Sequence, residues 1–136
     1  MSTWICLLRG VNLGARNRLA MADLRDALAD IGLVGARTYL QSGNVIVDVD
    51  EPERLATRVR TVIHERFGLD VPVIVRSPEW LTELLDWCPF RDVAEGRPAT
   101  VHFLHLATRP EPEQLERLTA QDWSPDELAV HDRGLD

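Results

Sequence analysis

The apolar positions in the first part of the chain change spacing from strand-like to helical and back. Residues 4–8 form a continuous apolar run typical of a strand, and a loop rich in Gly, Asn and Arg follows it. The spacing then becomes helical, since one helix face collects Met21, Leu24, Leu28 and Ile31. Gly32 predicts the end of this helix, because glycine readily adopts the left-handed conformation that follows a helix.

Two short apolar runs follow, at residues 36–40 and 45–49, and they predict a β-hairpin. The connecting residues 41–44 include Gly and Asn, which suit the positive φ angles of a tight turn. Pro52 then fits the first turn of a second helix, whose apolar face continues to Phe67 and ends at Gly68. Residues 71–75 predict a further strand, with Pro72 near its start or on an edge.

The resulting order is βαββαβ, which is most simply a ferredoxin-like α+β sandwich. Right-handed crossovers give this unit the strand order 4-1-3-2, with both helices on one face of the sheet. We therefore expect residues 1–76 to form a complete ferredoxin-like unit.

The second half of the chain predicts another βαβ pattern. A helix begins at Ser77 and Pro78, and residues 89–98 are the best linker candidate. A strand at 101–106, a helix starting near Pro110 with acidic residues 111 and 113 in its first turn, and a strand at 128–131 follow. No strand follows the turn sequence at 132–134, so we expect residues 77–136 to hold a connecting helix, a linker and an incomplete second ferredoxin-like unit.

Composition agrees with a globular protein that has a real core. The chain has 136 residues, 45% of them hydrophobic, and no apolar run approaches the roughly 20 residues of a membrane span. We expect a cytoplasmic protein, because the N-terminus lacks the pattern of a secretory signal. Two cysteines cannot form a disulfide framework, and Cys6 is expected to be a core residue because it lies inside an apolar strand.

The charge is acidic overall but unevenly distributed. A net charge of −7 argues against nonspecific nucleic-acid binding, which depends on clustered positive charge. Residues 1–44 nevertheless hold five arginines against three aspartates, a net +2. The basic end of the chain therefore contains both glycine-bearing turns.

Three segments together resemble a known family. LLRGVNLG at 7–14, MADLRDAL at 21–28 and RTYLQSGNVIV at 37–47 are similar to the uncharacterised bacterial domain-of-unknown-function family 1697 (DUF1697). The resemblance implies tandem ferredoxin-like halves and a further C-terminal segment with an Arg-Asn-Trp signature, which this chain lacks. The family has no established activity, so the resemblance leaves the function open.

The predicted topology brings the loop at 9–20, the turn at 41–44 and the loop at 68–70 to one edge of the sheet. The first helix also begins there, and helix N-termini carry unpaired N–H groups and partial positive charge. Glycines let backbone N–H groups approach a bound group, and arginines add charge. We therefore predict binding of an anionic or nucleotide-like small molecule by the candidate residues Arg9, Gly10, Asn12, Gly14, Arg16, Arg18, Gln41, Ser42, Gly43 and Asn44.

Other readings remain open. Gly, Asn and Ser are also what any tight turn requires, so the alternative is a noncatalytic protein-interaction module that uses the turn edge or the open sheet. No catalytic residue can be named and no cofactor or metal is expected, since His102 and His105 would point to opposite faces of a strand. The strands at 4–8 and 71–75 are apolar at consecutive positions, which predicts that both faces of the sheet are covered. We expect the face opposite the two helices to be covered by the second unit or by another subunit of a homo-oligomer.

Overall fold

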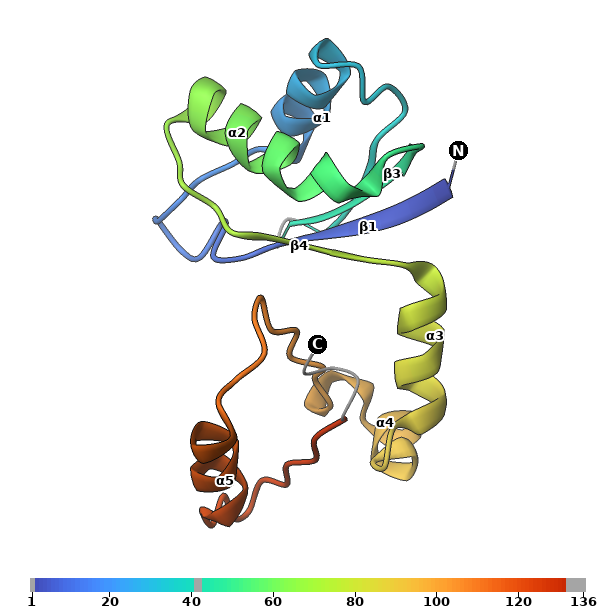
Figure 1. Ribbon diagram of the computed structural model, residues 1–136, viewed down its shortest axis with the longest axis vertical. Coiled ribbons are helices and arrows are strands. Elements are labelled where there is room, and N and C mark those ends of the chain that lie inside the picture. The colour runs from blue at the N-terminus through green and yellow to red at the C-terminus, as the bar shows by residue number, and fades with distance from the viewer. Residues whose placement is uncertain (1, 41–42, 132–136) are drawn as a thin grey trace. The chain divides into compact units, whose positions relative to one another are not determined.

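The computed structural model describes residues 2–40 and 43–131, which form a mixed α and β structure (Figure 1). Within these residues there are one four-stranded antiparallel sheet and five α-helices. The chain divides into two compact units, Met1–Asp86 and Trp87–Asp136, here called unit 1 and unit 2. No helix among the described residues is long and apolar enough to cross a membrane.

Unit 1 has the order of elements that the sequence predicts. Its elements are β1 (Ser2–Leu8), α1 (Met21–Asp30), β2 (Arg37–Tyr39), β3 (Asn44–Val49), the 3-10 turn η1 (Pro52–Arg54), α2 (Leu55–Phe67), β4 (Val73–Arg76) and α3 (Pro78–Trp87). The strand order in the sheet is β2-β3-β1-β4, as predicted. Figure 1 shows α1 and α2 on the same face of this sheet, also as predicted.

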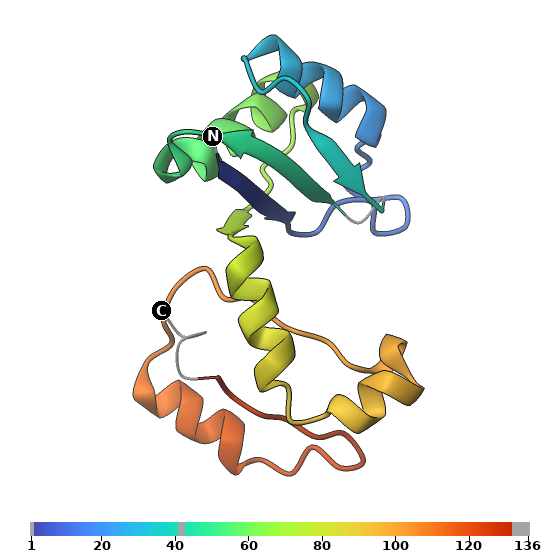
Figure 2. The same ribbon diagram turned by 90° about the vertical axis from the view of Figure 1, so that its right-hand side faces the viewer.

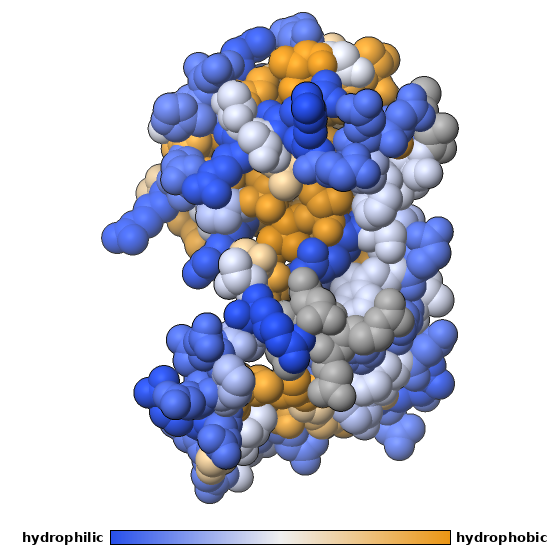
Figure 3. All heavy atoms as spheres, viewed as in Figure 1, coloured by the Kyte–Doolittle hydropathy of each residue, from blue (hydrophilic) through white to orange (hydrophobic). Residues whose placement is uncertain are grey.

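The core lies between that face and the two helices. Alternate residues of β1 and β3 point toward the helices, and Cys6, Val45 and Val47 are fully or almost fully buried there. In Figure 3, hydrophobic residues gather below α2, at the level of β4. The core cluster is completed by residues of the loops and helices, namely Leu8, Val11, Leu19, Met21, Leu24, Ala27, Leu28, Leu33, Val49, Leu55, Val59, Val62, Ile63 and Val71.

Several strand boundaries in unit 1 differ from the sequence prediction. The strand expected at 71–75 begins at Val73, because Pro72 has no N–H to give to a ladder and Val71 is buried in the core instead. The carbonyl of Pro72 still accepts a hydrogen bond from the Arg9 N–H, at 3.0 Å. The first hairpin strand, β2, has three residues where five were expected.

Unit 2 contains α4 (Arg91–Gly96), the 3-10 turn η2 (Pro98–Thr100) and α5 (Pro112–Ala120). The linker predicted at 89–98 is therefore wrong in part, because its central residues form α4, closed by the Ala94 N–H to the Phe90 carbonyl. The predicted helix near Pro110 is present as α5, and its Gln114 side chain accepts from the Glu111 N–H at 2.9 Å.

The strands predicted at 101–106 and 128–131 are not strands in this structure. Exposure does alternate along 101–106, as it would in an extended strand. Neither segment belongs to a β-ladder among the described residues, and a strand is defined by such a ladder.

Candidate functional site

The loop after β1 and the turn before β3 meet at one edge of the sheet. The Leu8 N–H donates to the Gly43 carbonyl at 2.9 Å, and Leu7 pairs with Asn44 in the sheet register. The bond from the Arg9 N–H to Pro72 brings the start of β4 to the same edge. The prediction that these turns lie together is confirmed for the described residues, whereas Gln41 and Ser42 lie outside them.

Gly43 is the point of closest approach between the turn and the loop. A Cβ atom at this position would lie 2.7 Å from Cγ2 of Val11 and 2.8 Å from Cβ of Leu8. The residue also has a φ of 97°, which side chains rarely tolerate. Gly43 therefore packs the turn against the loop, and this explains why a glycine stands here independently of any ligand.

Asn12 holds the base of the loop closed. Its side-chain amide donates to the Leu19 carbonyl and accepts from the Leu19 N–H, each at 2.8 Å. Its own N–H donates to the Asn17 carbonyl at 3.0 Å. The loop from residue 12 to residue 19 is therefore a closed, internally bonded structure, and the amide of Asn12 is engaged in holding it.

Asn17 is a loop residue that sequence reasoning missed. Its side chain donates to the Gly10 carbonyl at 3.0 Å, and its φ of 47° places it in the left-handed region, as does the φ of 55° at Asn12. Asparagine tolerates that region better than most residues. A pair of asparagines at both ends of a glycine-bearing loop was the available signal.

The positive charges of the site stand on this loop. Arg9, Arg16 and Arg18 are exposed, and within the described residues none of their guanidinium groups has a hydrogen bond or an ion pair. The loop leads directly into α1, whose N-cap residue Ala20 provides no side-chain hydrogen bond to the helix. Positive charge and uncapped N–H groups therefore follow one another along the same segment.

The remaining candidate residues have structural roles. The side chain of Asn44 donates to the Tyr39 carbonyl at 2.9 Å and closes the β2–β3 hairpin. Gly10 and Gly14 adopt φ angles of 75° and 60° in the loop, with open space around them. Chemically, the arrangement offers exposed guanidinium groups and backbone N–H groups.

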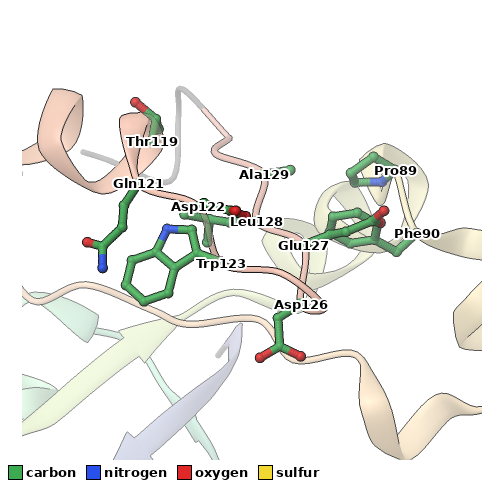
Figure 4. A pocket seen from close by; sticks show the side chains of 10 residues that line it. All are labelled: Pro89, Phe90, Thr119, Gln121, Asp122, Trp123, Asp126, Glu127, Leu128 and Ala129. Carbon is green, nitrogen blue, oxygen red and sulfur yellow. The ribbon is translucent and has the colours of Figure 1, made fainter.

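Two cavities lie elsewhere in the molecule. In unit 1, a shallow groove of about 480 Å³ runs along α2 beside Ile31, lined by Thr57, Arg58, Thr61 and neighbouring residues. In unit 2, a cavity of about 390 Å³ lies between the end of α5 and the segment that follows it (Figure 4). Neither cavity contains any of the sequence-predicted site residues.

The unit 2 cavity is acidic and aromatic. In Figure 4 the Trp123 ring lies on the left and Phe90 on the right, with Asp126 below them. The lining also includes the carboxylates of Asp122 and Glu127. Two hydrogen bonds from Ser124 hold the carboxylate of Asp122 and lower its pKa. Among the described residues no group of three His, Cys, Asp or Glu side chains is arranged to hold a metal ion.

Comparison with known proteins gives a family but no activity. The family model described as "Protein of unknown function (DUF1697)" matches residues 1–135. A solved structure of the conserved bacterial protein SP0830 from Streptococcus pneumoniae is similar, with 27% identity and a TM-score of 0.54. The match covers 62% of this chain and 48% of that chain, so this chain corresponds to about half of SP0830. No functionally curated protein matches the chain.

Proposed function

We propose, for a chain that belongs to the DUF1697 family of proteins of unknown function, that unit 1 binds an anionic or nucleotide-like small molecule at its turn edge. The binding surface consists of the loop from Arg9 to Ala20 and the turn at 41–44. One observation carries the proposal: three exposed arginines, which have no partner among residues 2–40 and 43–131, stand on a loop that is held closed by its own hydrogen bonds.

The energetics of the loop support this function. A loop that is already ordered loses little conformational entropy when a ligand binds, so more of the contact energy appears as affinity. Guanidinium groups bind carboxylate and phosphate oxygens in pairs, through two parallel N–H donors. Three like charges in one short loop repel one another, and a bound anion relieves that repulsion.

The start of α1 adds to the same surface. The first N–H groups of a helix have no intrahelical partner, and no side chain caps them here. Asp23 in the first turn places one negative charge beside them. The arginines are therefore needed to make the edge attractive to an anion, and the helix end is a secondary contribution.

A noncatalytic protein-interaction module is the second candidate. Leu13 and Leu40 flank the turn edge and are 65% and 62% exposed, which favours contact with an apolar surface. A protein partner that uses these leucines would depend on apolar contact, whereas a small anion would depend on the arginines. The two functions are therefore separable by mutation.

The test is a thermal-shift screen with phosphate, carboxylate and nucleotide compounds, followed by calorimetry of the best binder. A native-state ligand raises the melting temperature according to its affinity. Arg9→Ala should weaken binding by about 1.5–3 kcal/mol, the value of a charge-assisted hydrogen bond, and Arg9→Lys should recover only part of it. Arg54→Ala, at the end of η1 just before α2, is the matched control and should not change affinity.

Two results would contradict the anion site. One is the absence of any binder at millimolar concentrations across the three compound classes. The other is an Arg9→Ala variant that melts at a lower temperature without ligand and binds with unchanged affinity, which would make Arg9 a structural residue.

Three further proposals concern the whole chain. The strand order and the shared helix face support a ferredoxin-like architecture for unit 1. The position of α5 agrees with the helix expected in a second ferredoxin-like unit within residues 77–136. Two free cysteines, one of them buried, fit a reducing compartment and hence a cytoplasmic location.

A further inference from the structure

The cavity in unit 2 combines aromatic and aliphatic walls (Figure 4). Trp123 and Phe90 contribute ring surfaces to it, and Pro89, Leu128 and Ala129 contribute aliphatic ones. All of its lining residues belong to unit 2. Its volume of about 390 Å³ falls within the range of small-molecule sites, which is roughly 300–1,000 Å³. The cavity therefore has the size and the apolar lining that suit a small organic ligand.

The Trp123 ring is held in place although it is 41% exposed. Its indole N–H donates to the Leu118 carbonyl at 2.8 Å, and its own carbonyl accepts from the Asp126 N–H at 2.9 Å. A side chain that is already fixed loses little conformational entropy when a ligand packs on it. Because the N–H is already bonded, the ring offers a ligand its π surface, whose faces are electrostatically negative.

The lining also carries negative charge that no cation in the lining balances. Asp122, Asp126 and Glu127 line the cavity, whereas no Arg or His among residues 2–40 and 43–131 does. The Asp122 carboxylate accepts two hydrogen bonds from Ser124, but those of Asp126 and Glu127 have no partner within the described chain. Negative ring faces and unpaired carboxylates in one cavity favour a ligand that is both positively charged and apolar at its surface.

We propose that this cavity binds a small alkylammonium ion, which packs on the Trp123 ring while Asp126 and Glu127 balance its charge. A quaternary ammonium group has no N–H to place, so it needs only ring faces, apolar contacts for its methyl groups and nearby negative charge. The lining supplies all three. The chain contains no lysine, so no side-chain ammonium of its own can occupy the cavity. The proposal is independent of the anion site, because every residue it uses belongs to unit 2.

The test is an NMR titration of the full chain with choline and with dimethylbutanol, the neutral molecule in which carbon replaces the choline nitrogen. Sodium chloride keeps the ionic strength constant. The indole signal of Trp123, identified by its loss in Trp123→Phe, should shift saturably with choline, with a dissociation constant of about 1 mM. Dimethylbutanol has the same shape and should bind at least about tenfold more weakly, because attraction to the ring faces and carboxylates requires the charge.

Variants of the ring and of the carboxylates complete the test. Trp123→Leu should raise the choline dissociation constant by about tenfold, and Trp123→Phe should raise it less because a weaker π surface remains. Asp126→Asn combined with Glu127→Gln should raise it by about fivefold, from two lost ion pairs. The matched control, Asp92→Asn with Glu95→Gln, removes the same two charges from α4 outside the lining and should stay within about twofold of the wild type.

The spectrum of each variant without ligand verifies that unit 2 is folded. Three results would overturn the proposal. The first is a titration in which choline shifts no signal of a lining residue. The second is equal binding of choline and dimethylbutanol, and the third is equal affinity of the two double variants for choline.

Discussion

Cys6 shows how completely a residue of β1 is removed from water. Its side chain has no exposed surface, which confirms the prediction of a core cysteine from its place inside an apolar strand. Burial disfavours the charged thiolate and raises the pKa of the Cys6 thiol from 9.0 to about 12. The thiol therefore stays neutral in the folded protein at pH values where it ionises in the unfolded chain.

This pKa predicts a loss of stability at alkaline pH. Because the folded pKa is raised, its contribution is fully present below pH 9 and is lost as the pH rises from 9.0 toward about 12. The unfolding free energy of the wild type should fall, relative to Cys6→Ala, by up to about 1.4 kcal/mol per pH unit in that window. Urea denaturation at several pH values measures this, and parallel curves for the two proteins would contradict it.

Gly43 yields a second prediction at the level of one residue. Gly43→Ala adds a Cβ atom against Val11 and Leu8 and forces a side chain to a φ of 97°, so it should lower the unfolding free energy by about 2–4 kcal/mol. Gly14→Ala has a φ of 60° but open space, and should cost only about 1 kcal/mol. Denaturant unfolding compares the two, and equal losses would show that the contact with Val11 is unimportant.

Among the elements, the loop between β1 and α1 depends on one side chain. Asn12 makes two hydrogen bonds to Leu19, whereas Asn17 makes one side-chain bond, to Gly10. Both residues have positive φ angles of similar size, so the same substitution has a similar backbone cost at each. Comparing the two variants therefore separates the free energy that the Asn12 side-chain hydrogen bonds contribute from the cost of placing alanine at a positive φ.

Beyond the backbone cost that both variants share, we predict that Asn12→Ala lowers the unfolding free energy by about 2 kcal/mol, from the two lost bonds to Leu19 of about 1 kcal/mol each, and that Asn17→Ala costs about half as much. Chemical denaturation gives both values. The Leu19 amide should also exchange with solvent much faster in Asn12→Ala than in Asn17→Ala. Similar exchange rates in the two variants would mean that the loop closes without the Asn12 side chain.

The elements also show what the sequence could and could not predict. Apolar periodicity and the stops at Gly32 and Gly68 located α1, α2 and the strands of unit 1, because those patterns reflect burial against one core. The helix at Arg91–Gly96 escaped notice since its charged, glycine-ended sequence resembles a loop. The strand at 101–106 was overpredicted, because alternation predicts an extended segment but not a partner for it.

For the candidate site, topology was predictable and atomic detail was not. The meeting of the two turns follows from strand order alone, so the sequence predicts it. Side-chain geometry within the folded edge determines the hydrogen bonds between Asn12 and Leu19 and the contact between Gly43 and Val11. Asn12 therefore looked like a ligand donor in the sequence and is a loop-closing residue in the structure.

At the scale of the whole molecule, the two units differ in how they are stabilised. Every residue of the core cluster belongs to unit 1, and no described residue of unit 2 is fully buried. In unit 2 the ring of Trp87 packs edge-to-face with that of His131, with ring centroids 4.8 Å apart. Apolar burial is the main source of folding stability, so unit 1 should be the more stable unit.

Hydrogen exchange should reveal this difference directly. Backbone amides of β1, β3 and α2 should exchange slowest, because they open only with the core of unit 1. Amides of α5 should exchange at least about a hundredfold faster, through local opening. Measurement at low protein concentration avoids protection by self-association, and equal protection of α5 and α2 would contradict the prediction.

The closed base of the β1–α1 loop has a consequence for how this protein can change. Residues 13–16 form an exposed tip, and the bonds of Asn12 to Asn17 and Leu19 lie at its base. The sequence of such a tip can be exchanged, or another recognition segment inserted there, with little loss of folding stability. Of the three loop arginines, Arg16 lies within this tip, whereas Arg9 and Arg18 lie outside it. Substitutions in the tip could therefore change which ligand the turn edge binds without changing the fold of unit 1.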